Sequence, residues 1–277
     1  MKKLVVIGDP IEHSLSLLMW NRAFQALGLE NEYVYGALKV KKEELNKFVK
    51  KLRSGVFMGA NVTIPHKISI IQYLDELTKE AKLIGAVNTL YRENGTITGA
   101  NTDGLGCFLA FREKGVDIEG KIALILGAGG AARSVAFMLA LGGARELIIL
   151  NRTRKKAEKL SSEIQKKLGT KTRACGLPIK ELDVDVVINC TSVGMKGEQE
   201  GKSLITGEML KPEQVVMDIV YNPLETRLLK EARKAGATTI KGVEMLVYQA
   251  TINFRRWTGK EAPIELMKKT LVECLSR

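Results

Sequence analysis

The stretch KIALILGAGGAARSVAFMLALGG, residues 121–143, combines a buried strand, a glycine turn and a helix in that order. Gly127, Gly129 and Ala132 fit the pattern G-x-G-x-x-G/A between the strand and the helix. In that pattern the first glycine permits a sharp turn and the second lets the backbone approach a pyrophosphate. The small third residue lets the helix pack against the strand. We therefore expect a Rossmann-like unit whose helix N-terminus receives the pyrophosphate of a dinucleotide.

The rest of the chain alternates apolar runs with helical patterns, which predicts an α/β fold with parallel strands. After the glycine turn, the unit continues with strands at 146–150, 184–189 and 215–220 and a helix at 153–168. Before it, we expect strands at 4–7, 33–38, 56–63 and 86–92, helices at 17–27, 42–53 and 104–114, and a turn at 94–95. The last stretch, 243–277, carries two helical patterns separated by Gly259 and Pro263. A domain boundary is expected in or beside the helix at 104–114.

The composition is typical of a soluble globular protein. The chain has 277 residues, of which 45% are hydrophobic and 27% charged, and this length suffices for two domains. The N-terminal sequence MKKLVVIGDP predicts no signal peptide, because its apolar run is shorter than the roughly 7–15 residues that a signal peptide needs. No window approaches the ~20 apolar residues of a membrane-spanning helix. We therefore expect a cytoplasmic protein that does not associate with membranes.

The net charge of +12 favours anionic ligands. Nucleic-acid-binding modules usually concentrate positive charge on one element, often with stacking aromatic residues. Here the lysines are spread along helices such as 42–53, where they alternate with glutamates, and aromatic residues make up 5% of the chain. This distribution favours a small anionic substrate and disfavours nucleic acid.

The cysteines predict neither a metal site nor disulfides. Cys107, Cys175, Cys190 and Cys274 form no CxxC pair, and the chain has only two histidines. Zinc sites and disulfide frameworks both need closer or better spaced ligands. We expect free thiols and no bound metal.

The segment IILNRTRKK, residues 148–156, lies where a dinucleotide-binding fold selects its cofactor. An NAD site usually has an Asp or Glu there, which accepts hydrogen bonds from the ribose hydroxyls. This chain has Asn151, Arg152, Thr153 and Arg154 instead, and arginine suits the geometry of a phosphate. The pattern favours NADP over NAD. In the alternative interpretation, Thr153 caps the next helix and the basic side chains face solvent; both can hold together.

Four segments of the first half place polar residues where strands of a sheet end, which is the usual location for ligands in α/β folds. They are HSLS (13–16), NVTIPHK (61–67), AVNT (86–89) and GANTDGLG (99–106). Ser14 and Ser16 could bind a carboxylate or hydroxyls, or they could cap a helix. Lys67 could transfer a proton and Asp103 could pair with it. The alternative is an ordinary surface ion pair.

Taken in order, the motifs resemble those of the biosynthetic shikimate dehydrogenases over almost the full chain. They are G-x-P-I-x-H-S-x-S (8–16), N-V-T-x-P-x-K (61–67), G-A-V-N-T (85–89), N-T-D-G (101–104), GAGGAAR (127–133), NRT (151–153), N-x-T-S-x-G-M (189–195), D-x-V-Y-x-P (218–223) and G-x-x-M-L-V-x-Q-A (242–250). The resemblance implies reversible NADPH-dependent reduction of 3-dehydroshikimate to shikimate. It also implies a substrate-binding and catalytic domain at 1–103, a Rossmann-like NADP-binding domain at 104–242, and helices at 243–277 that return to the first domain.

The resemblance also assigns roles to individual residues. Lys67 and Asp103 would form the catalytic pair, with Lys67 handling the proton of the carbonyl or hydroxyl group. The substrate would be bound by Ser14, Ser16, Thr63, Lys67, Asn88, Asp103, Tyr221 and Gln249. NADP(H) would be bound by Gly127, Ala128, Gly129, Gly130, Ala131, Asn151, Arg152, Thr153, Arg154, Thr191, Ser192, Met195, Val220, Gly242 and Met245. Without the resemblance, Gln249 would be interpreted as a buried amide with local partners.

Two positions depart from the family pattern. Leu17 and Trp20 replace the proline and histidine that are usual after the second serine, which affects local packing more than chemistry. Related quinate-preferring enzymes tend to have threonine at the second serine and an acid near the NRT motif. Ser16 and Arg152 therefore indicate shikimate and NADP. The alternatives are a quinate/shikimate dehydrogenase with relaxed cofactor use and a non-catalytic nucleotide-sensing or nucleic-acid-binding protein on the same fold. A monomer or a homodimer is expected.

Overall fold

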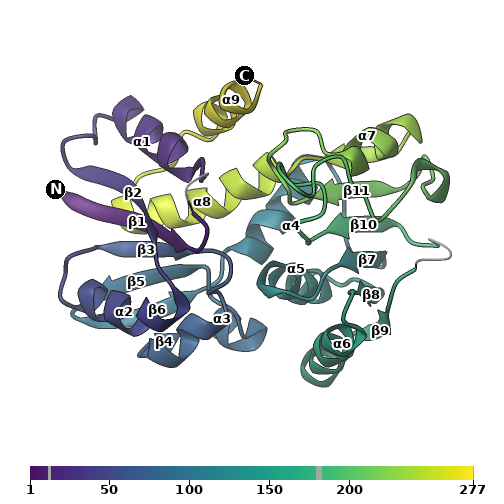
Figure 1. Ribbon diagram of the computed structural model, residues 1–277, viewed down its shortest axis with the longest axis horizontal. Coiled ribbons are helices and arrows are strands. Elements are labelled where there is room, and N and C mark those ends of the chain that lie inside the picture. Colours follow the sequence, from purple (N-terminus) through teal and green to yellow (C-terminus); the bar gives the residue numbers. More distant parts are fainter. Residues whose placement is uncertain (12–13, 179–182, 277) are drawn as a thin grey trace. The chain divides into compact units, whose positions relative to one another are not determined.

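The computed structural model describes residues 1–11, 14–178 and 183–276 (Figure 1). The chain divides into two compact units. The first comprises Met1–Thr102 and Ala250–Cys274, and the body of the second is Asp103–Gln249. Helix α8, Gly242–Thr258, therefore contributes its first half to the second unit and its second half to the first.

The first unit is built on a six-stranded sheet with the order β2-β1-β3-β5-β6-β4. Its strands are β1 (Lys2–Gly8), β2 (Tyr33–Lys39), β3 (Gly59–Val62), β4 (Glu76–Leu77), β5 (Thr89–Glu93) and β6 (Thr96–Ala100). The sheet is mixed, because β5 runs antiparallel to both β3 and β6. The reason is the turn at Asn94 and Gly95, whose φ values of 50° and 84° suit a tight β-hairpin. The sequence predicted this turn but not the strand that follows it.

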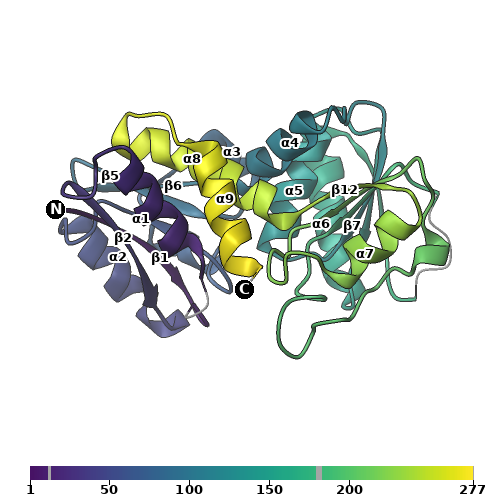
Figure 2. The ribbon, with the colours of Figure 1, turned by 90° about the horizontal axis from the view of Figure 1, so that it is seen from above.

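Helices cover both faces of the first sheet. They are α1 (Ser16–Ala26), α2 (Leu45–Arg53), α3 (Lys79–Ile84) and α9 (Ile264–Leu275), with short 3₁₀ segments η1 (Lys42–Glu44) and η2 (Ser69–Tyr73). Figure 2 shows α1, the second half of α8 and α9 over one face, and α2 lies on the other (Figure 1). Val5 and Ile7 of β1 join the apolar cluster under α2. Leu4 and Val6, which point to the other face, are 0% and 4% exposed, so both faces of β1 are buried, as its continuous apolar run predicts.

An aromatic cluster fills the space between β2, α1 and α8. Trp20 stacks on Tyr35 with ring centroids 4.8 Å apart and contacts Phe254 and Trp257 at 5.4 and 5.2 Å. Trp20 is fully buried, so the departure from the family pattern at this position has a packing role. The cluster attaches the C-terminal half of α8 to the first sheet.

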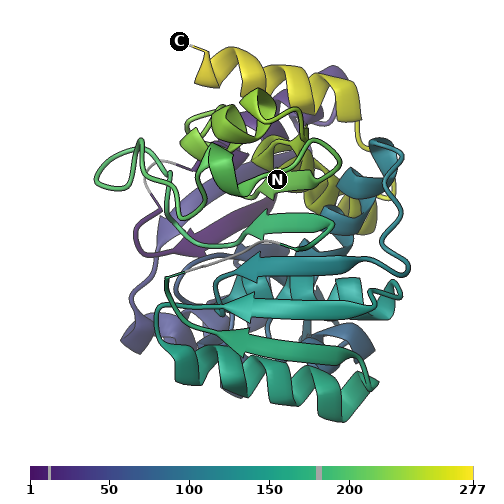
Figure 3. The same ribbon diagram turned by 90° about the vertical axis from the view of Figure 1, so that its right-hand side faces the viewer.

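The second unit contains six parallel strands in the order β12-β11-β10-β7-β8-β9, and Figure 3 shows them side by side. The strands are β7 (Ile122–Leu126), β8 (Glu146–Leu150), β9 (Lys171–Cys175), β10 (Val186–Asn189), β11 (Val215–Asp218) and β12 (Thr238–Ile240). The helices are α4 (Asp103–Glu113), α5 (Gly130–Leu141), α6 (Arg154–Leu168), the 3₁₀ segment η3 (Gly207–Met209), α7 (Arg227–Lys234) and the first half of α8. This is the Rossmann-like arrangement that the glycine turn predicts.

Several predicted strands have shifted bounds. The strand expected at 56–63 begins only at Gly59, because Val56 is still bonded to the end of α2 through its N–H to the Lys51 carbonyl. The strand expected at 86–92 begins at Thr89. The strand expected at 215–220 ends at Asp218, whose carboxylate accepts the N–H of Val220 and turns the chain. The two C-terminal helices and the free cysteines are confirmed.

Within the described part of the chain, no helix is long and apolar enough to cross a membrane. In the same residues, no group of three or more His, Cys, Asp or Glu side chains could hold a metal ion.

Candidate active site

The glycine turn of the second unit exposes the N-terminus of α5. Gly127 has a φ of +114°, and a Cβ there would lie 3.1 Å from the carbonyl oxygen of Cys190. Gly129 occupies the N-cap of α5, is exposed, and has open space where a side chain would stand. Ala132 is fully buried at the start of the helix. The first N–H groups of a twelve-residue helix are thus accessible to an anion, as a dinucleotide pyrophosphate requires.

The next strand brings the basic segment to the same edge of this sheet. β8 pairs in parallel with β7, and Gly127 donates its N–H to the Leu150 carbonyl at 2.6 Å. Asn151 is half-buried and donates its amide N–H to the Thr153 carbonyl, whereas Arg152 is exposed. Thr153 occupies the N-cap of α6, but its side chain makes no capping hydrogen bond. The capping alternative therefore does not account for the Thr153 hydroxyl.

Arg154 is the one predicted phosphate ligand that has an intrahelical partner. Its Nε lies 2.9 Å from Oε1 of Glu158, one turn further along α6, and both side chains are largely exposed. Such a pair contributes little to stability, on the order of 0.3–0.5 kcal/mol. Arg154 can exchange this partner for a phosphate at small cost.

Two buried polar residues shape the loops that follow β10 and β11. Asn189 accepts hydrogen bonds from the N–H and the hydroxyl of Thr191 through Oδ1. Its amide donates to the Val193 carbonyl and to Oδ1 of Asp218. Asp218 is fully buried and also accepts from Val220 N–H at 3.0 Å and from the Thr226 hydroxyl at 2.6 Å. Both loops thus depend on the Asn189–Asp218 pair.

Burial raises the pKa of Asp218 to about 6, and the three donors oppose this rise because they favour the ionised form. The loops carry Thr191, Ser192, Met195, Val220 and Tyr221. Ser192 and Met195 are exposed, Val220 is buried, and burial raises the pKa of Tyr221. The sequence did not assign roles to Asn189 or Asp218, although both lie in the quoted motifs.

The start of α8 packs closely against the loop that follows β11. A Cβ at Gly242 would lie 2.6 Å from the carbonyl oxygens of both Ile219 and Val220, so only glycine fits without movement. Met245 is buried one turn later. Gln249 is 8% exposed and donates to the Leu246 carbonyl at 3.0 Å, which is a local partner of the kind that the alternative interpretation expects.

In the first unit, the segment 61–67 packs against the end of β1. A Cβ at Gly8 would lie 2.6 Å from the side chain of Thr63, and Thr63 donates its N–H to the Ile7 carbonyl. Lys67 is half-buried, and its carbonyl accepts the N–H of Val87 at 2.7 Å. The two polar segments 61–67 and 86–89 are therefore bonded to each other at Lys67.

Asn88 lies at the centre of this arrangement. Its carbonyl accepts the Val62 N–H, and its own N–H donates to the Ala100 carbonyl. Its side-chain Oδ1 accepts the N–H of Thr102, the residue that directly precedes Asp103, at 2.9 Å. Asn88 thus connects the segments that carry Lys67 and Asp103. Asp103 itself is 5% exposed and is the first residue of α4 in the second unit.

Ser14 and Ser16 stand at the beginning of α1. Leu15 occupies the N-cap and no side chain caps the helix, so neither serine has the capping role of the alternative interpretation. Ser16 is 9% exposed and Ser14 is half-buried. His13, from the same motif, lies outside the described residues, as does Glu12.

Family models match most of the chain. They are the shikimate dehydrogenase substrate binding domain at residues 6–90, shikimate/quinate 5-dehydrogenase at 109–219 and the shikimate 5′-dehydrogenase C-terminal domain at 242–272. The NADP⁺-dependent shikimate dehydrogenase of Methanopyrus kandleri is 47% identical over 98% of this chain and 94% of its own. The chain belongs to the shikimate dehydrogenase family.

Solved structures of this family confirm the fold. A shikimate dehydrogenase in complex with NADP⁺ has a TM-score of 0.94 and 45% identity, covering 100% of this chain and 96% of that one. The enzyme of Thermus thermophilus, in complex with NADP(H) and shikimate, has a TM-score of 0.88 and 35% identity, covering 99% and 100%. The predicted family and α/β fold class are both confirmed.

Proposed function

We propose that this protein catalyses the reversible NADPH-dependent reduction of 3-dehydroshikimate to shikimate, in the biosynthesis of aromatic amino acids. The observation that carries the proposal is the combination of two features in a member of the shikimate dehydrogenase family. One is the exposed helix N-terminus beside an acid-free basic segment. The other is the bonded set of polar segments around Lys67 and Asn88.

The residues of the second unit fit NADP. The open space at Gly129 and the N-terminus of α5 suit the pyrophosphate, together with Gly127, Ala128, Gly130 and Ala131. The exposed Arg152 and the uncapped hydroxyl of Thr153 suit the 2′-phosphate, with Asn151 and Arg154 beside them. An Asp or Glu, which a ribose 2′-hydroxyl would require, is absent from residues 151–157. We assign the ribose and nicotinamide to Thr191, Ser192, Met195, Val220, Gly242 and Met245.

The substrate is assigned to polar side chains of the motifs from the first half of the chain, of the loop after β11 and of α8. They are Ser14, Ser16, Thr63, Lys67, Asn88, Asp103, Tyr221 and Gln249. Hydroxyl and amide groups match the carboxylate and hydroxyl groups of shikimate. Asn88 supports this role because it is 3% exposed and rigidly held.

In the proposed mechanism, Lys67 and Asp103 form the catalytic pair. NADPH, when bound, supplies the hydride that reaches the carbonyl carbon. The Lys67 ammonium group donates a proton to the carbonyl oxygen as that oxygen gains charge, and it takes the proton back from the hydroxyl group in the oxidation direction. Asp103 accepts a hydrogen bond from a substrate hydroxyl and holds the reacting carbon in place. The biosynthetic role of the family supports a cytoplasmic location. We also propose that the protein is a monomer or a homodimer.

The test is the forward reaction. The purified protein is incubated with 3-dehydroshikimate and NADPH, and the product is identified by NMR. Stoichiometric formation of shikimate is expected. No consumption of NADPH would overturn the proposal, and reduction of 3-dehydroquinate at a comparable rate would move the assignment to a quinate/shikimate dehydrogenase.

A further inference from the structure

A chain of buried side-chain hydrogen bonds in the first unit ends on Asn88 and begins outside the family motifs. The Tyr91 hydroxyl of β5 donates to Oδ1 of Asn253 at 2.7 Å. The amide of Asn253 then donates to the hydroxyl oxygen of Thr102 at 3.2 Å. Tyr91, Asn253 and Thr102 are 4%, 0% and 5% exposed. Asn253 therefore joins a strand residue to the loop that precedes Asp103.

These bonds place Oδ1 of Asn253 toward Tyr91 and its amide nitrogen toward Thr102. Burial raises the pKa of Tyr91 to about 12, so its hydroxyl group remains a donor at working pH. A donor at Oδ1 leaves the amide nitrogen of Asn253 facing Thr102. With the two ends exchanged, the Thr102 hydroxyl would have to donate to Oδ1 of Asn253 and would give up its own bond to Oδ1 of Asn88.

Thr102 is in turn hydrogen-bonded to the side chain of Asn88. Its hydroxyl oxygen accepts from the Asn88 amide at 3.0 Å as well as from Asn253. Its N–H and its hydroxyl hydrogen both point to Oδ1 of Asn88, at 2.9 and 3.3 Å. Thr102 therefore contacts both ends of the Asn88 carboxamide, and the Thr89 hydroxyl also donates to its Oδ1 at 2.9 Å. Asn253 in turn donates to the Thr102 hydroxyl oxygen.

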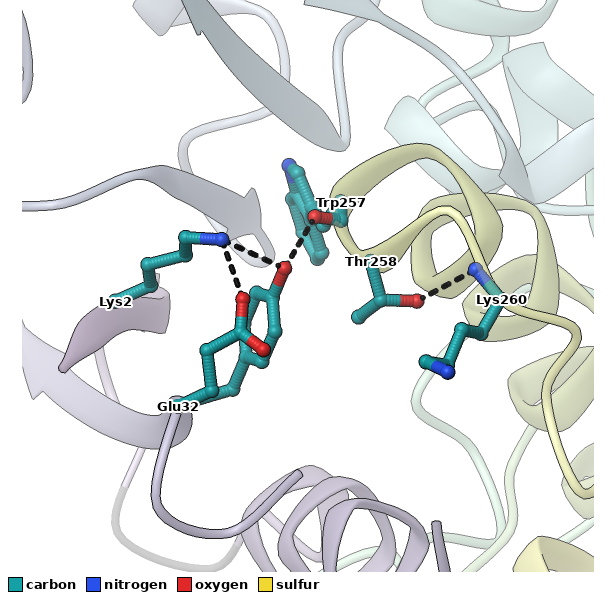
Figure 4. Close-up of polar contacts among 6 residues, drawn as sticks. Lys2, Glu32, Trp257, Thr258 and Lys260 are labelled. Atoms are coloured by element: carbon teal, nitrogen blue, oxygen red, sulfur yellow. Dashed lines mark hydrogen bonds and ion pairs between the residues drawn. The ribbon is translucent and has the colours of Figure 1, made fainter. Parts of the chain in front are cut away.

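The position of Asn253 is set by the rest of α8 in the same unit. Trp257, one turn later, accepts the Tyr33 hydroxyl hydrogen through its carbonyl oxygen at 3.2 Å, beside the Lys2–Glu32 ion pair (Figure 4). The Lys260 N–H donates to the Thr258 hydroxyl oxygen where the helix ends (Figure 4). The Tyr33 bond and the aromatic cluster attach this half of α8 to the first sheet. The helix that carries Asn253 is therefore anchored to the sheet, and the Asn253 amide contacts Thr102 from this helix.

We infer that Asn253 is a positioning residue for the substrate, which acts through Thr102 to hold the Asn88 carboxamide in its binding orientation. This inference rests on the proposed function, because Asn88 is assigned to shikimate there. Without Asn253, the Thr102 hydroxyl loses a donor, and the amide nitrogen of Asn88, which donates to that hydroxyl, is held less firmly. The bonds from Thr102 N–H and the Thr89 hydroxyl to Oδ1 of Asn88 remain.

The test compares Asn253→Leu with two other variants. Leucine has a similar volume but no hydrogen-bonding group. The double variant Tyr91→Phe, Asn253→Leu also removes the tyrosine hydroxyl that the single variant leaves without its acceptor. Gln214→Leu is the matched control, because Gln214 is a 1%-exposed amide in the second unit whose two ends are likewise both bonded, to the Val184 carbonyl and the Lys211 N–H.

The dissociation constant of shikimate is measured by calorimetry, along with the Michaelis constants of shikimate and NADP⁺ and the melting temperature. For Asn253→Leu, we expect both shikimate constants to rise about three- to tenfold, the effect of one lost hydrogen bond, with the NADP⁺ constant unchanged. The double variant should recover melting temperature but keep the weak shikimate binding. Gln214→Leu should lower the melting temperature alone.

Unchanged shikimate binding in Asn253→Leu would show that Asn253 is only structural, and so would recovery of binding together with stability in the double variant. A wild-type protein that does not bind shikimate would instead overturn the proposed function, and this inference with it.

Discussion

Lys67 carries the proton transfer in the proposed reaction, and its surroundings hold its backbone firmly. The Lys67 carbonyl is bonded to Val87, and Pro65 precedes it closely. Replacement of Lys67 by alanine should therefore remove a proton donor without disturbing the polar segments 61–67 and 86–89.

We expect Lys67→Ala to lower kcat by roughly 10²–10⁴-fold, the usual contribution of general acid–base catalysis. The Michaelis constant of shikimate should change little, because most binding groups remain. Steady-state kinetics in the oxidation direction measure both quantities. Near-normal kcat would remove Lys67 from the catalytic pair.

Arg152 is the residue that most directly tests the choice of cofactor. Its side chain is exposed beside the N-cap of α6, where a 2′-phosphate would lie. Arg152→Ala should raise the Michaelis constant of NADP⁺ by about tenfold or more, because a charged hydrogen bond contributes ≈ 1.5–3 kcal/mol. The constant for NAD⁺, which has no 2′-phosphate, should not change. Equal effects on both cofactors would contradict the phosphate assignment.

At the scale of elements, the ends of β10 and β11 are linked through the buried carboxylate of Asp218. Its pKa of about 6 exceeds the ordinary value of 3.8. The folded protein therefore binds a proton at Asp218 more readily than the unfolded chain between these two values. Its contribution to the free energy of unfolding should fall as pH rises from about 4 to 6, by roughly 3 kcal/mol, and stay constant above.

Asp218→Asn has no titrating group at this position, so its stability should lack this fall. Denaturant unfolding at several pH values gives the difference between the variant and wild type. Glu225→Gln is the control, because ion pairing to Arg233 and Lys241 lowers the pKa of Glu225 to about 2. Its contribution is lost only as pH falls below 4.5. A pH dependence between 4 and 6 that survives in Asp218→Asn would assign it to another group.

Elements with long apolar or periodic patterns could be predicted from the sequence, and elements with few residues could not. β7, β8 and α6 stand out because burial on one or both sides imposes a continuous pattern. β12, with three residues, and β4, with two, are too short to show a period. β6 could have been found, because Asn94-Gly95 between alternating residues is a strong hairpin signal.

The candidate site residues also fall into two groups: those that lie in local sequence motifs and those whose partners are distant in the sequence. Side chains within local motifs, such as Lys67 and Asn88, could be proposed as site residues from the resemblance. Asn253 could not, because its partner Tyr91 is 162 residues away in the sequence. A polar residue one turn after Gln249, in an otherwise apolar part of a helix, was the available signal.

At the scale of the whole molecule, the net charge of +12 acts on anionic ligands before they bind. NADP and shikimate are both anions, so the protein's field should accelerate their encounter. We expect kcat/KM for NADP⁺ to fall severalfold as ionic strength rises from about 0.01 to 0.15 M, where the Debye length shortens from about 30 to 8 Å. The value of kcat at saturation is the internal control and should change much less. A kcat/KM that does not depend on salt would exclude steering by the net charge.

The most direct test of the whole account is the initial rate of shikimate oxidation with NADP⁺ and with NAD⁺, with quinate run in parallel. The account predicts rapid turnover of shikimate with NADP⁺ and much slower turnover of the other three combinations. Comparable rates with NAD⁺ would contradict it, because they would show that the basic segment after β8 does not select NADP⁺. Comparable rates with quinate would contradict it as well, because they would show that the polar set around Asn88 does not select shikimate.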